Sequence, residues 1–450
     1  MFSRKKLLEL IIPLIIEQFL IMAVGFIDSI MVSSCGESAI SGISVVNTIN
    51  HMVNCLLTAL ATGGAVSAAQ YFGKKDKKSV SLISNQLFLL TLLFSGVLAA
   101  AAFWGNRNIL TMLYRNLETD VMKNARIYFF YSALSYPFYG IYNSGAALLR
   151  AIGNSKISMK ISLCKNVANI FGNAVFIYGF HIGVTGAALS TFLSHILSAA
   201  LILYFLYRDP EIQFSCRLSV RPAILKKILY IGIPNSLENG IPQIGRILLT
   251  TLTASFGTIA ITADSVTCNI GNFQLIPSEA IGIAMTTVVG QLVGAGDTEN
   301  MRKYAWKLVK LSHLSLLILG MALFLLEEPL FFLYHLSEET ISLVRLLLNY
   351  NIVCLIFMQP LSYAVPTALR AANDVHYTMA VSIATMWTCR IGLAYLLGRY
   401  AGLGVLGIWI AMTIEWCARA LFFVPRFIFL SKRGVQTDLS AMDAPDRFRK

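Results

Sequence analysis

The chain has 450 residues, of which 56% are hydrophobic and 13% are charged, and its mean hydropathy is +0.67. So few charged residues cannot cover the surface of a water-soluble protein of this length. The composition therefore excludes a soluble globular protein and indicates an integral membrane protein. The net charge of +13 does not call for a nucleic-acid partner, because anionic lipid and the rules of membrane insertion account for it.

Apolar stretches long enough to cross a bilayer follow one another along nearly the whole chain. A helix needs roughly 20 residues to span the hydrocarbon core. Twelve such helices are predicted, at residues 7–32, 44–72, 82–104, 124–148, 157–180, 185–207, 226–254, 259–293, 306–327, 341–369, 375–398 and 403–431. The predicted fold is therefore an all-α integral membrane protein with twelve transmembrane helices.

The second half of the sequence repeats the first. Pro13 and Glu17 recur as Pro234 and Glu238, 221 residues later. Other repeated elements keep this spacing to within one residue: Gly36 and Gly257, Gln70-x-x-Gly73-x-x-Asp76 and Gln291-x-x-Gly294-x-x-Asp297, Leu149-Arg150-Ala151 and Leu369-Arg370-Ala371, and Gly183-x-x-Gly186 and Gly404-x-x-Gly407. The repeat predicts two pseudo-symmetric six-helix lobes, a build typical of secondary transporters with a substrate site between the halves.

The predicted domains follow from the repeat and the apolar stretches. The N-terminal lobe covers residues 1–207 and the C-terminal lobe covers 226–431. A cytoplasmic linker at 208–225, rich in basic residues, joins the lobes, and a polar cytoplasmic tail follows at 432–450.

Basic residues occur in every second connection between the predicted helices. The basic connections contain Arg4, Lys5 and Lys6; Lys74, Lys75, Lys77 and Lys78; Arg150, Lys156 and Lys160; Arg208, Arg217, Arg221, Lys226 and Lys227; Arg302, Lys303 and Lys307; Arg370; and Lys432 and Arg433. The connections at 33–43, 181–184 and 255–258 have none. Because short basic loops stay on the cytoplasmic side, we predict a multi-pass protein of the plasma (inner) membrane with both termini cytoplasmic.

Features of enzymes are missing from the sequence. Gly402-x-Gly404-x-x-Gly407 matches a dinucleotide-binding fingerprint by letter, but it follows a membrane helix and not a strand, which indicates a turn between helices. The eight cysteines lie far apart, and there is no metal-binding histidine spacing, nucleophile elbow or pair of catalytic carboxylates. We expect no enzymatic activity and no cofactor.

Ionisable residues at membrane depth are costly and are therefore candidates for function. They are Glu17, Asp28, Lys165, His195, Glu238, Arg246, Asp264, Glu279, His313, Arg390, Glu415 and Arg419. Glu17 and Glu238 are repeat partners, which favours a shared architectural role beside a functional one. Glu415 and Arg419 are four residues apart, so a local ion pair is expected. Asp28 has no acidic partner, because Leu249 occupies the equivalent position in the second lobe.

Carboxamide side chains cluster on the fifth predicted helix. Asn169 and Asn173 are four residues apart and share one helix face, and Asn166 lies next to them. Polar side chains in an apolar helix point inward to find partners. One carboxylate with amide oxygens and a hydroxyl would suit a small hard cation or a proton, and the alternative is a structural hydrogen-bond network.

The whole chain resembles the multidrug and toxic compound extrusion (MATE) transporters. The features that carry the resemblance are the Pro13 and Asp28 helix leading into Gly36-x-x-Ala39, the two Gln-x-x-Gly turns, Leu149-Arg150 with Gly153, the Asn-rich helix before Gly183-x-x-Gly186-Ala187-Ala188, and Gly232-Ile233-Pro234-Asn235-x-x-Glu238-Asn239. The resemblance implies export of cationic or amphiphilic compounds, by alternating access, in exchange for Na⁺ or H⁺.

The resemblance also implies a cation-coupling site in the N-terminal lobe. Carried over to this sequence, the site consists of Asp28, Asn169, Asn173 and Thr191, and it would be the place of any bound Na⁺. Many relatives have Asp where this chain has Asn173, so Asp28 is the one carboxylate of the set. The stretch 357–362 lacks the acid that some relatives use, which leaves Glu238 and Glu279 as unassigned intramembrane acids.

Substrate and ion are expected to bind this site with different affinities in the two states of the transporter. Neutralisation of Asp28 should bend or repack the first helix, in which Pro13 and Gly25 are positions where a helix can bend. Adaptable side chains that would line a large substrate cavity are Met22, Phe26, Met52, Tyr139, Tyr142, Phe273, Gln274 and Met285. The expected partners are a small organic cation and the lipid bilayer, and the expected state is a monomer. A flippase for a lipid-linked saccharide is the alternative function.

Overall fold

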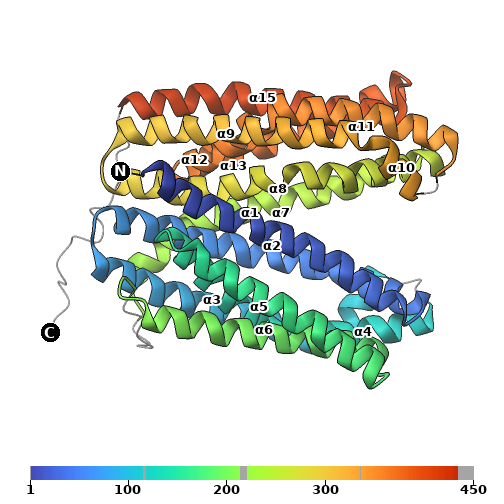
Figure 1. The fold of residues 1–450 in the computed structure, drawn as a ribbon, viewed down its shortest axis with the longest axis horizontal. Coiled ribbons are helices and arrows are strands. Elements are labelled where there is room, and N and C mark those ends of the chain that lie inside the picture. Colours follow the sequence, from blue (N-terminus) through green and yellow to red (C-terminus); the bar gives the residue numbers. More distant parts are fainter. Residues whose placement is uncertain (1, 115–117, 213–219, 335, 434–450) are drawn as a thin grey trace. The chain divides into compact units, whose positions relative to one another are not determined.

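The computed structural model describes residues 2–114, 118–212, 220–334 and 336–433. These residues form helices and short connections (Figure 1), and the predicted all-α fold is confirmed. They divide into two compact units, of which the first ends at Ser236 and the second begins at Leu237. The division thus lies inside a helix, and the predicted lobe boundaries stay a prediction. Residues 213–219 of that linker and 434–450 of the predicted tail lie outside the described residues.

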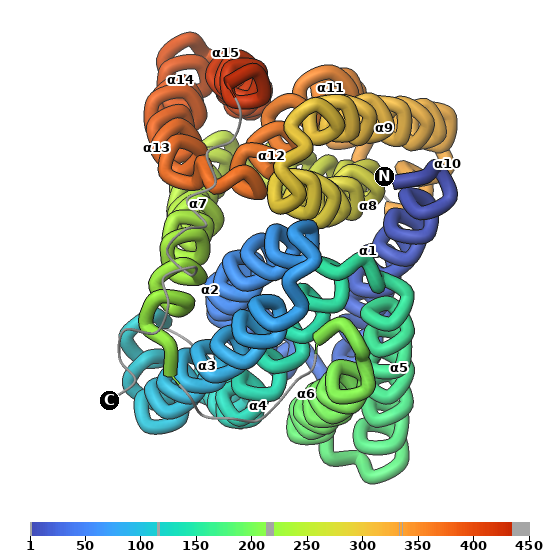
Figure 2. The backbone as a smooth tube through the Cα atoms, turned by 90° about the vertical axis from the view of Figure 1, so that its left-hand side faces the viewer, coloured from blue at the N-terminus to red at the C-terminus, as the bar shows by residue number. Residues whose placement is uncertain are grey.

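Helices of the first unit match the first six predicted spans and extend them. They are α1 (Arg4–Ser33), α2 (Glu37–Gly73), α3 (Lys77–Leu113), α4 (Thr119–Ala151), α5 (Ser155–Asn173), which continues as the π-helical η1 (Ala174–Gly179), and α6 (Gly183–Arg208). Helix α4 packs against α2, α3 and α6, while α5 packs against α1 and α6. Figure 2 shows α4 between α3 and α6 in this unit.

The second unit contains most of the seventh predicted span and all of the last five, two of which are divided by π-helical turns. Helix α7 (Pro222–Ala254) begins in the first unit. It is followed by α8 (Thr258–Gly294), α9 (Thr298–Leu325), α10 (Glu327–Tyr334), α11 (Glu338–Gln359), η2 (Pro360–Ala364), α12 (Val365–Ala371), α13 (Val375–Thr385), η3 (Met386–Gly392), α14 (Leu393–Tyr395), η4 (Leu396–Tyr400) and α15 (Gly404–Arg433). Helix α8 packs against α9, α11 and α12, as α2 packs against α3 and α4 in the first unit. The packing therefore repeats with the sequence.

Nine helices of the described chain are long and apolar enough to cross a membrane by length and composition. Helices α4, α5 and α7 are not among these nine, although each was predicted as a span. Helix α5 carries Lys165 and three carboxamides, and α7 carries Glu238 and Arg246. Polar residues of this kind make contacts in the protein interior and lower the mean hydropathy of the helix that carries them.

The repeated Gln-x-x-Gly-x-x-Asp motif forms the same turn in both units. The Asp76 side chain accepts a hydrogen bond from the Ser79 backbone N–H at 3.1 Å, and so caps α3. Asp297 caps α9 in the same way by accepting from the Asn300 backbone N–H at 3.1 Å. An aspartate at this position satisfies a backbone donor that the first helical turn leaves free. The motif therefore stops one helix and starts the next.

The glycine motif before the last helix is a turn, as the sequence predicted. Gly404 has a φ of +57°, and Gly183 at the equivalent position has a φ of +53°. Residues with a Cβ atom are disfavoured in this left-handed region, whereas glycine adopts it readily. Gly407 serves close packing, because a Cβ atom there would lie 2.6 Å from the Gly398 backbone nitrogen.

Gly407→Ala is expected to lower the melting temperature of the purified protein in detergent. The added methyl group forces α15 away from the backbone of η4, and overpacking of this kind costs about 1–3 kcal/mol. Gly96→Ala in α3 is the matched control, since no atom lies within 4 Å of its added Cβ. Equal melting temperatures for the two variants would show that the contact at Gly407 is not tight in the folded protein.

Candidate functional site

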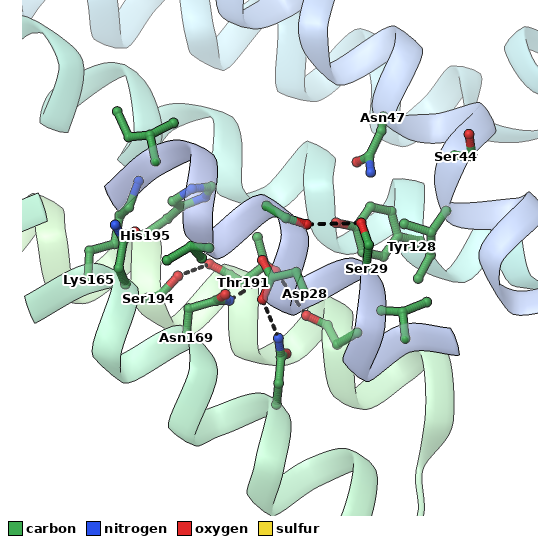
Figure 3. Close-up of a pocket in the computed structure, with 18 of the residues that line it drawn as sticks. Asp28, Ser29, Ser44, Asn47, Tyr128, Lys165, Asn169, Thr191, Ser194 and His195 are labelled. Carbon is green, nitrogen blue, oxygen red and sulfur yellow. Dashed lines mark hydrogen bonds between the residues drawn. The ribbon is translucent and has the colours of Figure 1, made fainter. Parts of the chain in front are cut away.

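A cavity of about 420 Å³ lies inside the first unit, and it is lined by five helices. Its lining residues are Ile21, Val24, Gly25, Asp28, Ser29 and Val32 of α1; Ile40, Ile43, Ser44 and Asn47 of α2; Tyr128 of α4; Lys165, Asn166, Asn169 and Asn173 of α5; and Ala187, Thr191, Ser194 and His195 of α6. Figure 3 shows the polar members arranged around Asp28. All four residues predicted for the cation-coupling site are among them.

Asp28 is held by amide groups of α5. Asn173 Nδ2 donates to Asp28 Oδ1 at 2.8 Å (Figure 3). The Asn169 amide, with its nitrogen turned toward α1, donates to both carboxylate oxygens at 2.9 and 3.0 Å. In the opposite orientation the same nitrogen donates to the Ser190 and Thr191 hydroxyls at 3.4 and 3.3 Å. Asn169 therefore has partners in either orientation, one set on α1 and the other on α6.

Two further oxygen atoms of the site belong to Thr191 and Asn173. The Thr191 hydroxyl donates to the Ala187 carbonyl at 3.0 Å, and its oxygen accepts from the Asn169 amide when that nitrogen is turned toward α6. Asn173 Oδ1 is buried and has no hydrogen-bond partner among the described residues. Buried polar atoms without partners are uncommon and call for an explanation. A small hard cation that coordinates Asn173 Oδ1, or a protonated group that donates to it, would satisfy this atom.

Lys165 and His195 also line the cavity, although the sequence assigned them no role. Figure 3 shows both on the same side of Asp28, away from Ser44 and Asn47. Lys165 is four residues before Asn169, so it extends the polar face of α5 by one turn. This four-residue spacing could have placed Lys165 beside the predicted site from the sequence alone.

Glu17 and Arg150 form an ion pair in the first unit. Arg150 Nη1 donates to Glu17 Oε1 at 3.2 Å, and the Ser158 hydroxyl lies 3.1 Å from each carboxylate oxygen. The Tyr142 hydroxyl donates to Glu17 Oε1 at 3.5 Å. Glu17 is 2% exposed. These contacts join α1 to α4 and α5.

Glu238 occupies the equivalent position in the second unit, with two arginines. Arg370 Nη1 donates to Glu238 Oε1 at 2.7 Å, and Arg419 Nη2 lies 3.6 Å from the same oxygen. The Ser382 hydroxyl also donates to it at 2.9 Å. The expected pair of Glu415 with Arg419 is confirmed at 3.5 Å. Glu415 also pairs with Arg390, at 3.1 Å. Buried acids in this unit are thus neutralised by arginines.

Other predicted residues lie elsewhere. Glu279 is exposed and has no hydrogen bond or ion pair with another described residue. None of the eight residues predicted for a substrate cavity lines the cavity around Asp28. In this structure Tyr142, Gln274 and Met285 are buried, Phe26, Met52 and Phe273 are exposed, and Met22 and Tyr139 are half-buried. A second cavity formed by these side chains remains a prediction.

Comparisons with known proteins cover nearly the whole chain. The MatE family model matches residues 13–175 and 234–396, one match in each half. The probable multidrug resistance protein NorM of Thermotoga maritima is 28% identical over 433 residues, which are 94% of this chain and 92% of that protein. The uncharacterized transporter YisQ of Bacillus subtilis is 25% identical, with 92% of each chain covered.

Solved structures share the fold. The outward-facing structure of a multidrug resistance MATE family transporter of the MOP superfamily has a TM-score of 0.90 at 20% identity, with 96% of both chains covered. A crystal structure of MATE in the bent conformation has a TM-score of 0.88 at 21% identity, again with 96% of both chains covered. The predicted twelve-helix, two-lobe layout is confirmed by this likeness. With both halves matched by the family model, the chain belongs to the MatE family of membrane transporters.

Proposed function

We propose that the protein is a secondary active antiporter that exports cationic or amphiphilic drugs or metabolites in exchange for Na⁺ or H⁺. The observation that carries the proposal is the position of Asp28. It is the single carboxylate among the described residues that line the N-terminal cavity, and amides of α5 hold it there. The relative in Thermotoga maritima is described as a probable multidrug resistance protein, which supports drugs as the cargo.

The proposed coupling depends on competition for Asp28. With the amide nitrogens of Asn169 and Asn173 turned toward it, the carboxylate is stabilised without a bound cation. A proton would neutralise Asp28 in place. A Na⁺ ion would instead require the amides to rotate and present oxygen, which Asn169 is able to do because it has partners in both orientations. In either case the ion removes the negative charge that a cationic substrate needs.

Helix α1 is the element through which this competition acts. It carries Asp28 and contains Pro13, which removes a backbone hydrogen bond, and Gly25, where the cavity leaves space around the backbone. Loss of the amide contacts to Asp28 would free the end of α1 from α5. We propose that α1 then bends or repacks, because a ligand shifts a conformational equilibrium by its differential affinity for the two states.

Dye efflux from proteoliposomes tests the proposal. A fluorescent organic cation is loaded, and a Na⁺ gradient or a pH gradient is imposed separately. We expect one of the two gradients to accelerate efflux of the dye above that from protein-free liposomes. Efflux that responds to neither gradient would contradict antiport and would direct attention to the flippase function, which none of the comparisons supports.

We further propose that the chain acts as a monomer in the plasma membrane with both termini in the cytoplasm. The alternation of basic and non-basic connections supports this orientation. Labelling of single cysteines from one side of sealed vesicles, in a background without the other native cysteines, would measure it. Reaction of a cysteine in the connection at residues 34–36 only from the outside, and of one at residues 74–76 only from the inside, is the expected pattern.

A further inference from the structure

A second charged group faces the same cavity as Asp28. Lys165 lines it together with His195, and no carboxylate oxygen of the described residues lies within 4.0 Å of its ammonium group. Its nearest described aromatic contact is Tyr142, whose ring centroid lies 5.0 Å from Lys165 Nζ. An ammonium group held against an aromatic face is attracted to the ring and still has its hydrogen-bond donors. It is therefore available to a ligand.

The acids near Lys165 are already satisfied by other donors. Glu17 accepts from Arg150 and Ser158, and Asp28 accepts from Asn173. Neither acid has a direct ion pair with Lys165. An unpaired charge inside a membrane protein is costly, and its default interpretation is a functional one. Lys165 is therefore a candidate to bind an acceptor from outside the protein.

The two charges are arranged along one line of the cavity. Lys165, Asn169 and Asn173 succeed one another at four-residue intervals on α5, so each step is about 6 Å along the helix axis. Asn173 donates to Asp28 at one end of this row, and Lys165 is at the other end. Figure 3 shows Lys165 and Asp28 separated across the cavity. A volume of about 420 Å³ is within the range of small-molecule sites.

We propose that Lys165 is a specificity-determining residue that binds an anionic group of the substrate, so that the cavity selects zwitterions with a cationic amine at Asp28 and a carboxylate or similar acid at Lys165. This inference rests on the proposed function, because it takes the cavity to be a substrate site. It narrows the substrate class beyond organic cations. A simple cation would meet Asp28 but would also meet the positive charge of Lys165.

Equilibrium binding of two dyes tests the proposal without any need for transport. The first dye is a fluorescent xanthene with a free carboxylate, and the second is the methyl ester of the same dye. Both are titrated with purified protein in detergent, and binding is followed by fluorescence polarisation. We expect the wild-type protein to bind the free acid more tightly than the ester, since a charge-assisted hydrogen bond favours the acid.

Lys165→Met should weaken binding of the free acid by about 10-fold or more, the loss that follows removal of a hydrogen bond to a charged group. The ester should bind unchanged or more tightly. Lys165→Arg should restore the preference for the acid, and Lys160→Met, at an exposed position of the same helix, is the matched control. A wild type without preference for the acid, or an equal loss of both dyes in Lys165→Met, would overturn the proposal.

The same titrations separate this proposal from the antiport proposal. If neither gradient drives efflux but Lys165→Met loses only the acid, antiport fails and the zwitterion site stands. If a gradient drives efflux but the dyes show no dependence on Lys165, antiport stands and the specificity role fails. A purely structural role of Lys165 predicts equal loss of both dyes and a lower melting temperature.

Discussion

Asp28→Asn is expected to slow gradient-driven dye efflux strongly while the protein remains folded. The variant keeps the size of the side chain and one carbonyl acceptor for Asn173, but it cannot carry a negative charge or exchange a proton. A coupling free energy of about 1–3 kcal/mol corresponds to a 5- to 150-fold effect. The initial rate of efflux under the effective gradient should therefore fall by about one to two orders of magnitude, measured in proteoliposomes with matched protein content.

Asp264→Asn is the control for this experiment. Asp264 lies on α8 in the second unit and accepts a hydrogen bond from the Trp409 indole at 3.0 Å, which an asparagine oxygen can also accept. It is an intramembrane acid outside the N-terminal cavity. We expect its variant to keep the dependence on the effective gradient. Normal efflux by Asp28→Asn, with unchanged dependence on Na⁺ and pH, would rule out coupling through Asp28.

The fold was predictable because membrane helices are set by composition and length. Apolar runs located a helix at each of the twelve predicted positions, and the repeat assigned these helices to two lobes. The ends were less accurate. Helix α2 begins at Glu37 and not at 44, and α3 continues to Leu113 and not to 104. The extra turns contain polar residues, so a search for apolar stretches does not include them. Polar residues are tolerated there because water or lipid headgroups can solvate the ends of a membrane helix.

The polar site was predictable in part. The shared face of Asn169 and Asn173 followed from their spacing, and the resemblance supplied Asp28 and Thr191 as their neighbours. The amide contacts that hold the carboxylate did not follow, because the rotation of a carboxamide depends on partners from α1 and α6. Lys165 was identified as an intramembrane charge but not as part of the cavity, although its distance of four residues from Asn169 contained that information.

The adaptable residues proposed for a substrate cavity were the least predictable group. Residue type identifies flexible or aromatic side chains but does not show which way they point. Gln274 donates to the Leu316 carbonyl at 3.0 Å inside the second unit, and Met285 is fully buried. Long apolar helices offer several faces to their neighbours, and the choice among those faces depends on packing that no single helix determines.

The sequence shows that the buried acid is repeated and that the Leu-Arg-Ala motif is repeated. It does not show that the acid pairs with the arginine of that motif. The structure joins Glu17 to Arg150 and Glu238 to Arg370, so that two separate repeats are the two halves of one ion pair in each unit. Their separation of more than 130 residues hides the contact from any local pattern. The equivalence supports an architectural role for these acids.

Glu238→Gln is expected to destabilise the protein by about 3 kcal/mol or more. The change leaves Arg370 and Arg419 buried without the carboxylate between them, and removal of one partner of a buried ion pair typically costs about 3–5 kcal/mol. The melting temperature in detergent should fall clearly. Glu279→Gln removes an exposed acid and should leave it unchanged. Combination of Glu238→Gln with Arg370→Gln should recover part of the loss, because one uncompensated charge is removed.

Glu17→Gln tests whether the two lobes use the pair in the same way. Glu17 has one arginine partner, Arg150, whereas Glu238 has two. A purely architectural pair predicts that Glu17→Gln is destabilising but less so than Glu238→Gln, and that both variants keep the ion dependence of efflux. A changed ion dependence of Glu17→Gln with an unaltered melting temperature would contradict this prediction. Glu17 would then take part in coupling, and the two pairs would be related in sequence but would have different roles.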